Sequence, residues 1–364
     1  MQWNFLYLDF PYFDYTSIEN RPLGGGESSL IYLMRSLVKK GDEVFFFAPN
    51  VEEFKINNFS QINFKNFHKE IKKNSGVLVY SGDLLQIKKI KEITKDMPFF
   101  LWMHHAANQG AVDALANQEV TKNLTSIIFV SEWQKNGFLK KFNINNIPNN
   151  IIGHGISYEY ENLFLSFDDF KKQKENNYGI YTSTPYRGLE ILIEIEKFLK
   201  NRDIKIDIFS GMGTYSMSDL AYADIFKKMK DSKIFNNYGP QIKINLANFH
   251  KNKSFLFYPS IFAETFCISV LDALASGCDV VTTNFGCLKE VYKDYATFME
   301  FDSERTIEDI AKKFALIMDQ SIERKNDNFD KWAKGKFKLM IDLQKKFSWS
   351  SRAVEWQTTA KKFL

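Results

Sequence analysis

The sequence predicts an α/β protein with two doubly wound, Rossmann-like domains that face an interdomain cleft. Short apolar runs alternate with longer amphipathic stretches, which is the pattern of parallel sheets covered by helices. A chain of 364 residues, 45% of them hydrophobic, is long for one core and fits two compact domains. The pattern lapses between about Ile152 and Asn177, so the domains are expected to join near mid-chain.

The first half carries the elements of one such domain. An amphipathic stretch that ends at Gly41 predicts a helix, and Ser131 is a suitable N-cap for another helix that begins at Glu132. The predicted elements are strands at Trp3–Leu8, Glu43–Ala48, Gly76–Tyr80, Pro98–Met103 and Ser126–Val130 and a helix at Ser28–Lys40.

The second half repeats the pattern. Because the carboxyl ends of parallel strands meet at one edge of a sheet, ligands are expected at the cleft between the two domains. The predicted elements are strands at Tyr178–Thr182, Ile204–Phe209, Ile242–Ile244, Ser254–Tyr258 and Val280–Thr283 and helices at Leu189–Lys200, Ile268–Ser276 and Ile307–Asp319.

Composition narrows the class of protein. The net charge of +4 permits an acidic partner without requiring one, and the lysine-rich stretches contain interspersed acids, as solvated helix faces do. The three cysteines, Cys267, Cys278 and Cys287, lack metal-ligand spacing and are expected to be reduced and buried. The N-terminal stretch lacks a basic region, and no apolar run approaches roughly 18 residues, so a cytoplasmic protein with at most peripheral membrane contact is expected.

The segment from Phe262 to Glu290 is the most informative part of the chain. Glu264 precedes an apolar run, and Asp272 follows eight residues later. A helix that begins near Phe266 or Cys267 would turn unpaired backbone N–H groups towards the loop of Glu264, which favours an anion there. A nucleotide sugar, with a diphosphate between two polyols, fits this arrangement. An ordinary amphipathic helix with two solvated acids explains the spacing equally well.

This segment resembles the paired-acid signature of glycosyltransferase family 4, a family of retaining enzymes with the GT-B fold. Glu264, Phe266 and Asp272 match the signature, although Asp272 replaces the usual second Glu and Cys267 replaces the usual Gly. The resemblance implies that Glu264 binds the hydroxyls of the donor sugar and that Asp272 binds the ribose. The donor-binding residues that it implies in this segment are Glu264, Thr265, Phe266, Cys267, Ile268 and Asp272.

A glycine-rich turn, PLGGGESS, lies between the first strand and the first helix. Gly24, Gly25 and Gly26 allow close approach of the backbone, so they could contact the diphosphate or the sugar. The turn matches neither the dinucleotide fingerprint nor a Walker loop. Family 4 members carry a Gly-Gly-x-Glu run here, which the resemblance extends to this chain, while a mobile flap is the alternative.

The loop YTSTPYRGLE follows the first strand of the second domain. By the register of the resemblance, Arg187 takes the position of a Lys directed at the donor diphosphate, and Thr182 stands where an Arg is usual. Arg187 is then the principal catalytic candidate, because a guanidinium can stabilise the leaving phosphate. Ser183 and Thr184 are candidate neutral donors. The alternative is that Arg187 is a surface residue at a helix start.

His104 and His105 end the strand FFLWMHH. The resemblance implies that His104 lies near the sugar and the acceptor, as a catalytic-site residue, with His105 the weaker candidate; a structural role is the alternative for both. His154 takes the place of the Asn in the family's Asn-Gly turn and is expected to preserve that turn. Gly286 and Glu290 resemble the family's closing loop, which Glu290 is expected to brace.

No Asp-x-Asp motif occurs in the chain, so no metal or other cofactor is expected and the nucleotide sugar serves as co-substrate. The tail from Phe347 begins FSWSS, and a family 4 helix with a similar opening crosses back to the N-terminal domain. The expected domains are therefore 1–165 with 348–364 on the acceptor side and 166–347 on the donor side.

The resemblance implies a retaining, metal-independent, hexosyltransferase-like enzyme that moves a sugar from a nucleoside-diphosphate sugar to an acceptor hydroxyl. The acceptor expected by family frequency is a glycan or glycolipid precursor. Three alternatives stay open. The net positive charge permits transfer to a modified base in DNA, and the substitutions at Thr182 and Cys267 favour a non-catalytic nucleotide-sugar binding protein. A dehydrogenase-like protein is the weakest alternative.

Overall fold

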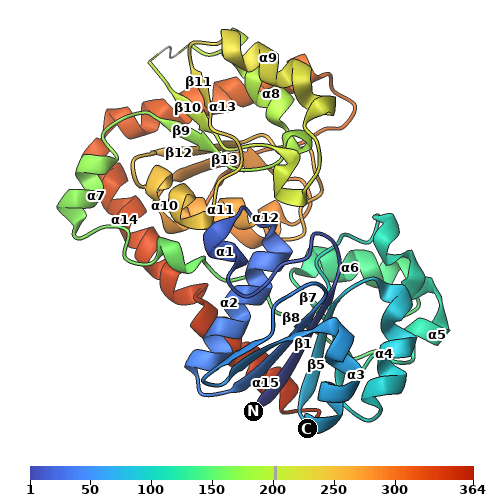
Figure 1. The fold of residues 1–364 in the computed structure, drawn as a ribbon. Coiled ribbons are helices and arrows are strands. Elements are labelled where there is room, and N and C mark those ends of the chain that lie inside the picture. The colour runs from blue at the N-terminus through green and yellow to red at the C-terminus, as the bar shows by residue number, and fades with distance from the viewer. Residues whose placement is uncertain (201–202) are drawn as a thin grey trace. The chain divides into compact units, whose positions relative to one another are not determined.

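The computed structural model describes residues 1–200 and 203–364 (Figure 1). The chain forms two compact units. The first comprises Met1–Ser17, Gly25–Gly155 and Trp349–Leu364, and the second comprises Ile18–Gly24 and Ile156–Ser348. Each unit contains its own sheet with helices around it, which confirms the predicted fold class.

The sheet of the first unit has the strand order β3-β4-β2-β1-β5-β6-β7-β8. Only β3 and β4 pair antiparallel among these neighbours; the other pairs are parallel. The five predicted strands are confirmed to within two residues, whereas three short strands, β3, β4 and β8, escaped prediction because their side chains are largely not buried. The strands are β1 Gln2–Leu8, β2 Glu43–Ala48, β3 Phe54–Ile56, β4 Phe59–Asn63, β5 Val77–Gly82, β6 Phe99–Trp102, β7 Ser126–Phe129 and β8 Asn149–Ile151.

The direction of winding in this sheet reverses beside β1. The chain passes from β1 to β2 on one side, and then returns to place β5 on the other side. The connections leave the carboxyl ends of β1 and β5 in opposite directions, and such a reversal is where open α/β sheets bind ligands.

Helices cover this sheet (Figure 1). Ser131 is confirmed as an N-cap, because its hydroxyl accepts a hydrogen bond from the Gln134 backbone N–H at 3.2 Å. The tail helix α15 packs on α2, where Trp356 meets the rings of Trp3 and Trp102 at 6.3 and 4.9 Å. The helices are α2 Gly25–Lys39, α3 Phe67–Glu70, α4 Ile87–Thr94, α5 Gln118–Thr121, α6 Glu132–Lys141 and α15 Trp349–Ala360. The single-turn helix α1 Ser17–Asn20 is grouped with the second unit from Ile18 on.

The second unit has a parallel sheet of order β11-β10-β9-β12-β13-β14. Its winding reverses between β9 and β12, which pair directly. The strands are β9 Gly179–Tyr181, β10 Ile206–Ile208, β11 Phe235–Asn237, β12 Phe255–Tyr258, β13 Asp279–Thr283 and β14 Thr297–Met299. The helices are α7 Phe167–Gln173, α8 Leu189–Glu194, α9 Ala223–Asp231, α10 Lys243–Lys251, α11 Ile268–Ala275, α12 Leu288–Tyr292, α13 Ile307–Asp327 and α14 Phe329–Lys346.

One predicted strand of this unit is wrong. Ile242–Ile244 is not a strand, because Ile242 is the extended residue before α10 and Ile244 lies in the first turn of that helix, 47% exposed. The apolar alternation there is too short to separate strand from helix. The helix predicted at Leu189–Lys200 is shorter than expected, since α8 ends at Glu194 and only one further 3-10 turn follows, over Ile195–Lys197.

One helix starts where its predicted range begins, and another starts three residues early. The helix α11 begins at Ile268, the first residue of the predicted helix Ile268–Ser276, and not as early as Phe266 or Cys267, because Cys267 has a positive φ of 70° that no helical residue adopts. The helix α2 begins at Gly25 and not at Ser28, so Gly25 and Gly26 form its first turn. No helix among residues 1–200 and 203–364 combines the length and apolar character required to cross a bilayer.

Candidate functional site

Arg187 and Glu264 meet at the point in the second unit where the sheet reverses its winding. Arg187 ends the 3-10 turn Pro185–Arg187 that follows β9, and Glu264 lies in the loop that follows β12. Because β9 and β12 are the neighbouring strands at the reversal, both side chains stand at the carboxyl ends where this fold class binds ligands. The structure therefore brings together two residues that the sequence singled out separately.

The two side chains form a buried ion pair. Arg187 Nη1 lies 3.0 Å from Glu264 Oε1 and 3.2 Å from Oε2, and Glu264 is 3% exposed. The Tyr258 hydroxyl donates a further hydrogen bond to Glu264 Oε1 at 2.5 Å. The guanidinium stacks over the Phe262 ring at 4.7 Å. Among the residues that the structure describes, none hydrogen bonds to its buried Nε.

The protonation states in this cluster follow from burial and charge. Burial alone would lower the pKa of Arg187, but Glu264 raises it well above the ordinary value. Burial, and then the charge of Glu264, raise the pKa of Tyr258 well above its ordinary value. Arg187 therefore stays a cation and Tyr258 stays a hydrogen-bond donor at neutral pH.

Two glycines allow the loops around the ion pair to approach closely. Gly286 has φ +68°, and a Cβ added there would lie 2.5 Å from the backbone N and O of Glu264. The neighbouring Cys287 N–H donates to the Glu264 carbonyl at 2.9 Å. Gly188 has φ +117°, and its Cβ would lie 2.1 Å from the Pro259 carbonyl oxygen. Both positions require glycine on steric and conformational grounds.

The helix α11 begins beside this pair. Cys267, buried and in the left-handed conformation, precedes it, and the Tyr292 hydroxyl donates to the Cys267 carbonyl at 3.1 Å. Ser269 in the first turn donates to the carbonyl of Thr182 at 2.5 Å, which ties the helix start to the end of β9. The N-terminal N–H groups of such a helix favour an anion. The three cysteines are free and buried, as predicted.

Ser183 joins the cluster, since its hydroxyl lies 3.4 Å from the Tyr258 hydroxyl. Thr184 is buried, and its carbonyl accepts a hydrogen bond from Tyr181 at 2.9 Å. The hydroxyls of Thr182 and Thr184 are buried and make no hydrogen bond with the described residues. The loop after β9 thus offers neutral hydroxyl groups beside one cation.

Asp272 does not join Glu264 but has partners of its own. Its carboxylate accepts hydrogen bonds from the Ser157 backbone N–H at 3.3 Å and hydroxyl at 3.1 Å. Lys243 Nζ forms an ion pair with it at 2.7 Å, and Asp272 is 2% exposed. No pattern in the sequence pointed to Lys243, because this residue lies within the segment wrongly predicted as a strand.

His104 lies in the first unit, at the end of β6, with Gly26 packed against it. A Cβ at Gly26 would lie 3.4 Å from the imidazole. The His104 ring stacks in parallel on His154, with centroids 5.4 Å apart and planes 8° apart. Burial, reinforced by His105, lowers the pKa of His104 to about 3, and burial followed by His104 lowers that of His154 well below its usual value. Both rings are therefore neutral at pH 7. His154 was expected only to preserve a turn, but in the structure its ring also packs in the interior of the unit.

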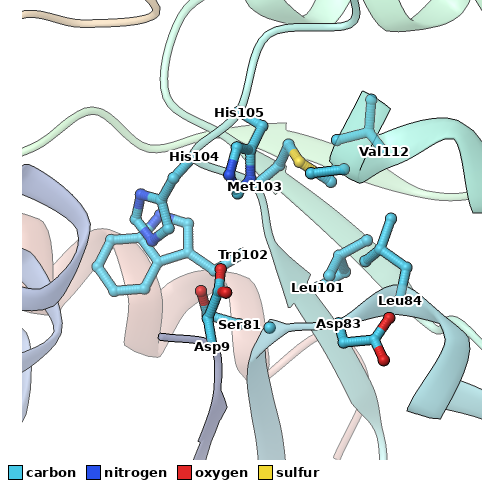
Figure 2. A pocket seen from close by; sticks show the side chains of 12 residues that line it. Asp9, Ser81, Asp83, Leu84, Leu101, Trp102, Met103, His104, His105 and Val112 are labelled. Carbon is cyan, nitrogen blue, oxygen red and sulfur yellow. The ribbon is translucent and has the colours of Figure 1, made fainter. Parts of the chain in front are cut away.

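His104 and His105 line a pocket of about 190 Å³ in the first unit (Figure 2). Asp9 and Ser81 line it too. Neither was predicted as a site residue, although Asp9 directly follows a predicted strand. Gly25 and Gly26 belong to the first unit, and Gly24 is grouped with the second. The role of these three glycines in donor binding stays a prediction. Among the described residues, no three or more His, Cys, Asp or Glu side chains are placed to hold a metal ion.

The sequence matches a known family model over residues 184–335, described as glycosyl transferases group 1. This span contains Arg187, Glu264 and Asp272. A curated relative is the O-antigen chain mannosyltransferase RfbU of Salmonella typhimurium strain LT2, which is 25% identical over 227 residues. That match covers 60% of this chain and spans 59% of the relative's length.

Solved structures share the fold over the whole chain. A glycosyltransferase from Rickettsia africae ESF-5 matches with a TM-score of 0.72 at 15% identity, covering 100% of this chain and 98% of that one. Alr3699/HepE of Anabaena, in complex with UDP-glucose, matches with a TM-score of 0.72 at 13% identity and covers 99% of both chains. At these identities the likeness establishes the two-domain fold alone.

Proposed function

We propose that this chain, whose residues 184–335 match the group 1 glycosyl transferases, moves a sugar from a nucleoside-diphosphate sugar to a hydroxyl of an acceptor. The observation that carries the proposal is the meeting of Arg187 and Glu264 at the reversal point of the second sheet. A cation and a carboxylate side by side suit a ligand that presents a phosphate next to hydroxyls.

Arg187 is proposed to stabilise the departing diphosphate. One edge of its guanidinium is occupied by Glu264, while its Nε has no hydrogen-bond partner among the described residues and can donate to a phosphate oxygen. The start of α11 would add backbone donors and partial positive charge. Together they would compensate for Thr182, which stands where the family usually has a second cation.

Glu264 is proposed to accept hydrogen bonds from the hydroxyls of the donor sugar. Its two oxygens are already bonded to Arg187 and Tyr258, which fix the carboxylate in place before a ligand arrives. Asp272 is proposed to accept the ribose hydroxyls. Since Lys243 and Ser157 hold its carboxylate, the ribose must share it with them.

The reaction is proposed to retain the configuration of the sugar. The bond between the anomeric carbon and the phosphate oxygen breaks, the acceptor oxygen bonds to the same face, and the leaving phosphate oxygen takes the acceptor proton. Such a step needs no pair of carboxylates astride the sugar. Arg187, as a fixed cation, would stabilise the negative charge that develops on the phosphate. Full activity in the presence of a chelator is expected.

The acceptor is proposed to be a glycan or glycolipid precursor, and the donor a hexose nucleotide. The mannosyltransferase relative, which acts in O-antigen synthesis by its name, supports this class. A modified base in DNA is the less favoured acceptor.

A thermal-shift panel of UDP-, GDP-, ADP- and dTDP-sugars tests the donor site. At a concentration of 100 times its Kd, a bound donor stabilises the protein by about 2.7 kcal/mol. We expect one donor to raise the unfolding midpoint of the wild type but not of Arg187→Ala or Glu264→Ala. Arg305→Ala is the matched control, because Arg305 is half exposed and pairs with Asp302 on the surface of the same unit. If no nucleotide sugar shifts the wild-type midpoint, the proposal fails.

Hydrolysis of the donor separates an enzyme from a binding module. The enzyme should slowly release free nucleotide from the donor that gives the largest shift, because water can replace the acceptor. Chromatography of the nucleotide would detect this. A protein that binds a donor, yet neither transfers nor hydrolyses it, would instead be the non-catalytic alternative.

A further inference from the structure

The pocket of the first unit lies where that sheet reverses its winding. Asp9 directly follows β1, and Ser81, Gly82 and Asp83 lie at the end of β5. These two strands are the neighbours at the reversal, so the pocket occupies the position at which open α/β sheets bind ligands. Its volume of about 190 Å³ is well above the roughly 10–15 Å³ that one water molecule requires on the same scale. That is room for at least one small ring.

Polar groups line opposite sides of the pocket. Figure 2 shows Asp9 and Ser81 on one side and His104 and His105 on the other. Asp9 Oδ1 accepts the Phe10 backbone N–H at 2.9 Å, while no hydrogen bond from the described residues reaches its other oxygen. The second acid, Asp83, is already engaged, because its carboxylate caps the 3-10 turn Leu84–Gln86 through Leu85 N–H at 3.0 Å. Asp9 is therefore the carboxylate available to a ligand.

The pocket offers both acceptors and donors. Burial lowers the pKa of His105 and the charge of Asp9 opposes that shift, so His105 is mainly neutral at pH 7 and provides one donor and one acceptor. Trp102 lines the pocket too, but its indole ring packs against the rings of His104 and Trp356, at 4.7 and 4.9 Å, and its Nε1 is buried. Asp9, Ser81 and His105 therefore supply the polar groups that a ligand can reach.

The charge of the pocket selects among ligands. The described residues that line it include Asp9 and Asp83 but neither Lys nor Arg. A phosphate or carboxylate placed here would lie against Asp9 without a compensating cation from those residues, which is unfavourable. A ring that bears hydroxyls offers donors to Asp9 and an acceptor to the imidazole N–H group of His105. Phe10, which follows Asp9 and is 65% exposed, adds an apolar surface beside this position.

We propose that this pocket binds one neutral, hydroxyl-bearing ring of the acceptor through Asp9 and His105. The assignment to an acceptor rests on the proposed function, whereas the binding of a neutral polyol stands on the pocket itself. The acidic lining of the pocket argues against binding of a phosphorylated group of the acceptor here, including the backbone of DNA.

Saturation-transfer NMR on the full chain tests the pocket with methyl glucoside, methyl mannoside and methyl galactoside as neutral probes. Glucose 6-phosphate is the anionic counterpart and glucosamine the cationic one. We expect at least one neutral glycoside to receive saturation, with glucose 6-phosphate receiving none. Asp9→Asn should weaken binding of that glycoside about tenfold, since a hydrogen bond to a charged group is lost. His105→Gln should weaken it too, with the unfolding midpoint recording whether each variant folds.

Asp113→Asn is the matched control, because it removes the same charge from an exposed site of the same unit, where Asp113 pairs with Lys141. It should leave binding of the glycoside unchanged. The proposal is overturned if no neutral glycoside is saturated, if glucose 6-phosphate or glucosamine binds more tightly than every neutral probe, or if folded Asp9→Asn binds as the wild type does. Nucleotide-sugar shifts in the same variants separate this result from the donor site. If nucleotide sugars still raise the unfolding midpoint but no glycoside binds, the pocket proposal alone is refuted. If a glycoside binds but no nucleotide sugar raises the midpoint, the proposed donor site alone is refuted.

Discussion

Arg187 and Glu264 are 77 positions apart in the sequence, yet Arg187 Nη1 lies within 3.2 Å of both oxygens of Glu264. The groups proposed to bind the donor thus neutralise each other when no ligand is bound. Removal of one partner leaves a buried charge, which commonly costs about 3 to 5 kcal/mol, whereas replacement of both by apolar groups can be nearly neutral. This pair therefore couples the stability of the second unit to its proposed function.

We expect Arg187→Met to lower the free energy of unfolding by about 3 kcal/mol, because Tyr258 is then the one side-chain partner left to Glu264 among the described residues. The double variant Arg187→Met with Glu264→Leu should recover at least half of that loss, while donor binding stays absent. Urea unfolding of the wild type, both single variants and the double variant completes the cycle. Additive losses would show that the pair is not coupled.

Tyr258→Phe should cost about 1.5 to 3 kcal/mol of stability, because Tyr258 donates to a charged carboxylate at 2.5 Å. Tyr292→Phe is the matched control. It is equally buried and donates to a neutral carbonyl, that of Cys267, so about 1 kcal/mol is expected. Urea unfolding measures both values. Equal losses would mean that the charge of Glu264 adds nothing to the Tyr258 hydrogen bond.

Gly286→Ala should abolish donor binding and destabilise the second unit. The new Cβ would lie 2.5 Å from the backbone N and O of Glu264, so the loop that carries the carboxylate must move. Gly41→Ala is the control for the strain of positive φ alone, since Gly41 has φ +88° with nothing within 4 Å of the added Cβ. We expect it to cost about 1 kcal/mol and to leave the donor's thermal shift intact. A full shift in Gly286→Ala would contradict the proposed site.

Asp272 should distinguish ribose from deoxyribose. We expect the nucleotide that gives the largest thermal shift to bind about tenfold more tightly to the wild type than its 2′-deoxy analogue does, because a hydroxyl bonded to a carboxylate is lost. In Asp272→Ala the two nucleotides should bind alike, as titration calorimetry can show. A ratio that stays tenfold in the variant would place the ribose elsewhere. In that case the bonds to Lys243 and Ser157 would be the whole role of Asp272.

Acid should destabilise the protein through its buried histidines. His250 is 1% exposed, and burial lowers its pKa to about 3, as it does for His104. The unfolded chain takes up protons below about pH 6.5, whereas the folded chain does not. The free energy of unfolding should therefore fall as the pH drops from about 6.5 towards 4, by up to about 1.4 kcal/mol per pH unit for each histidine.

His250→Gln tests the share of that residue by urea unfolding at pH 7 and pH 5. The variant should lose less stability than the wild type between these two values, because one of the histidines that resist protonation is gone. The exposed His68 supplies the control, and His68→Gln should lose as much as the wild type. An unchanged slope in His250→Gln would show that His250 is protonated in the folded protein.

Most strands could be predicted because buried parallel strands are short apolar runs. The exceptions are informative. Ile242–Ile244 has the composition of a strand but forms a helix start, since three residues cannot distinguish a period of 2 from one of 3.6. The three missed strands of the first unit have few buried side chains, so the hydrophobic pattern by which strands are recognised was absent.

The sequence by itself determined the spacing of Glu264 and Asp272, the place of Arg187 after the first strand of the second domain, and the family resemblance. Such features are local, because one helix or one strand-to-loop turn fixes them. Only the tertiary structure decided the partners. The order of strands brings Arg187 to Glu264, and packing turns Asp272 to Lys243 and to Ser157, 115 positions away. The tertiary structure also brings Asp9, Ser81 and His105 together around one pocket. Which distant side chains meet depends on strand order, and no local spacing encodes that order.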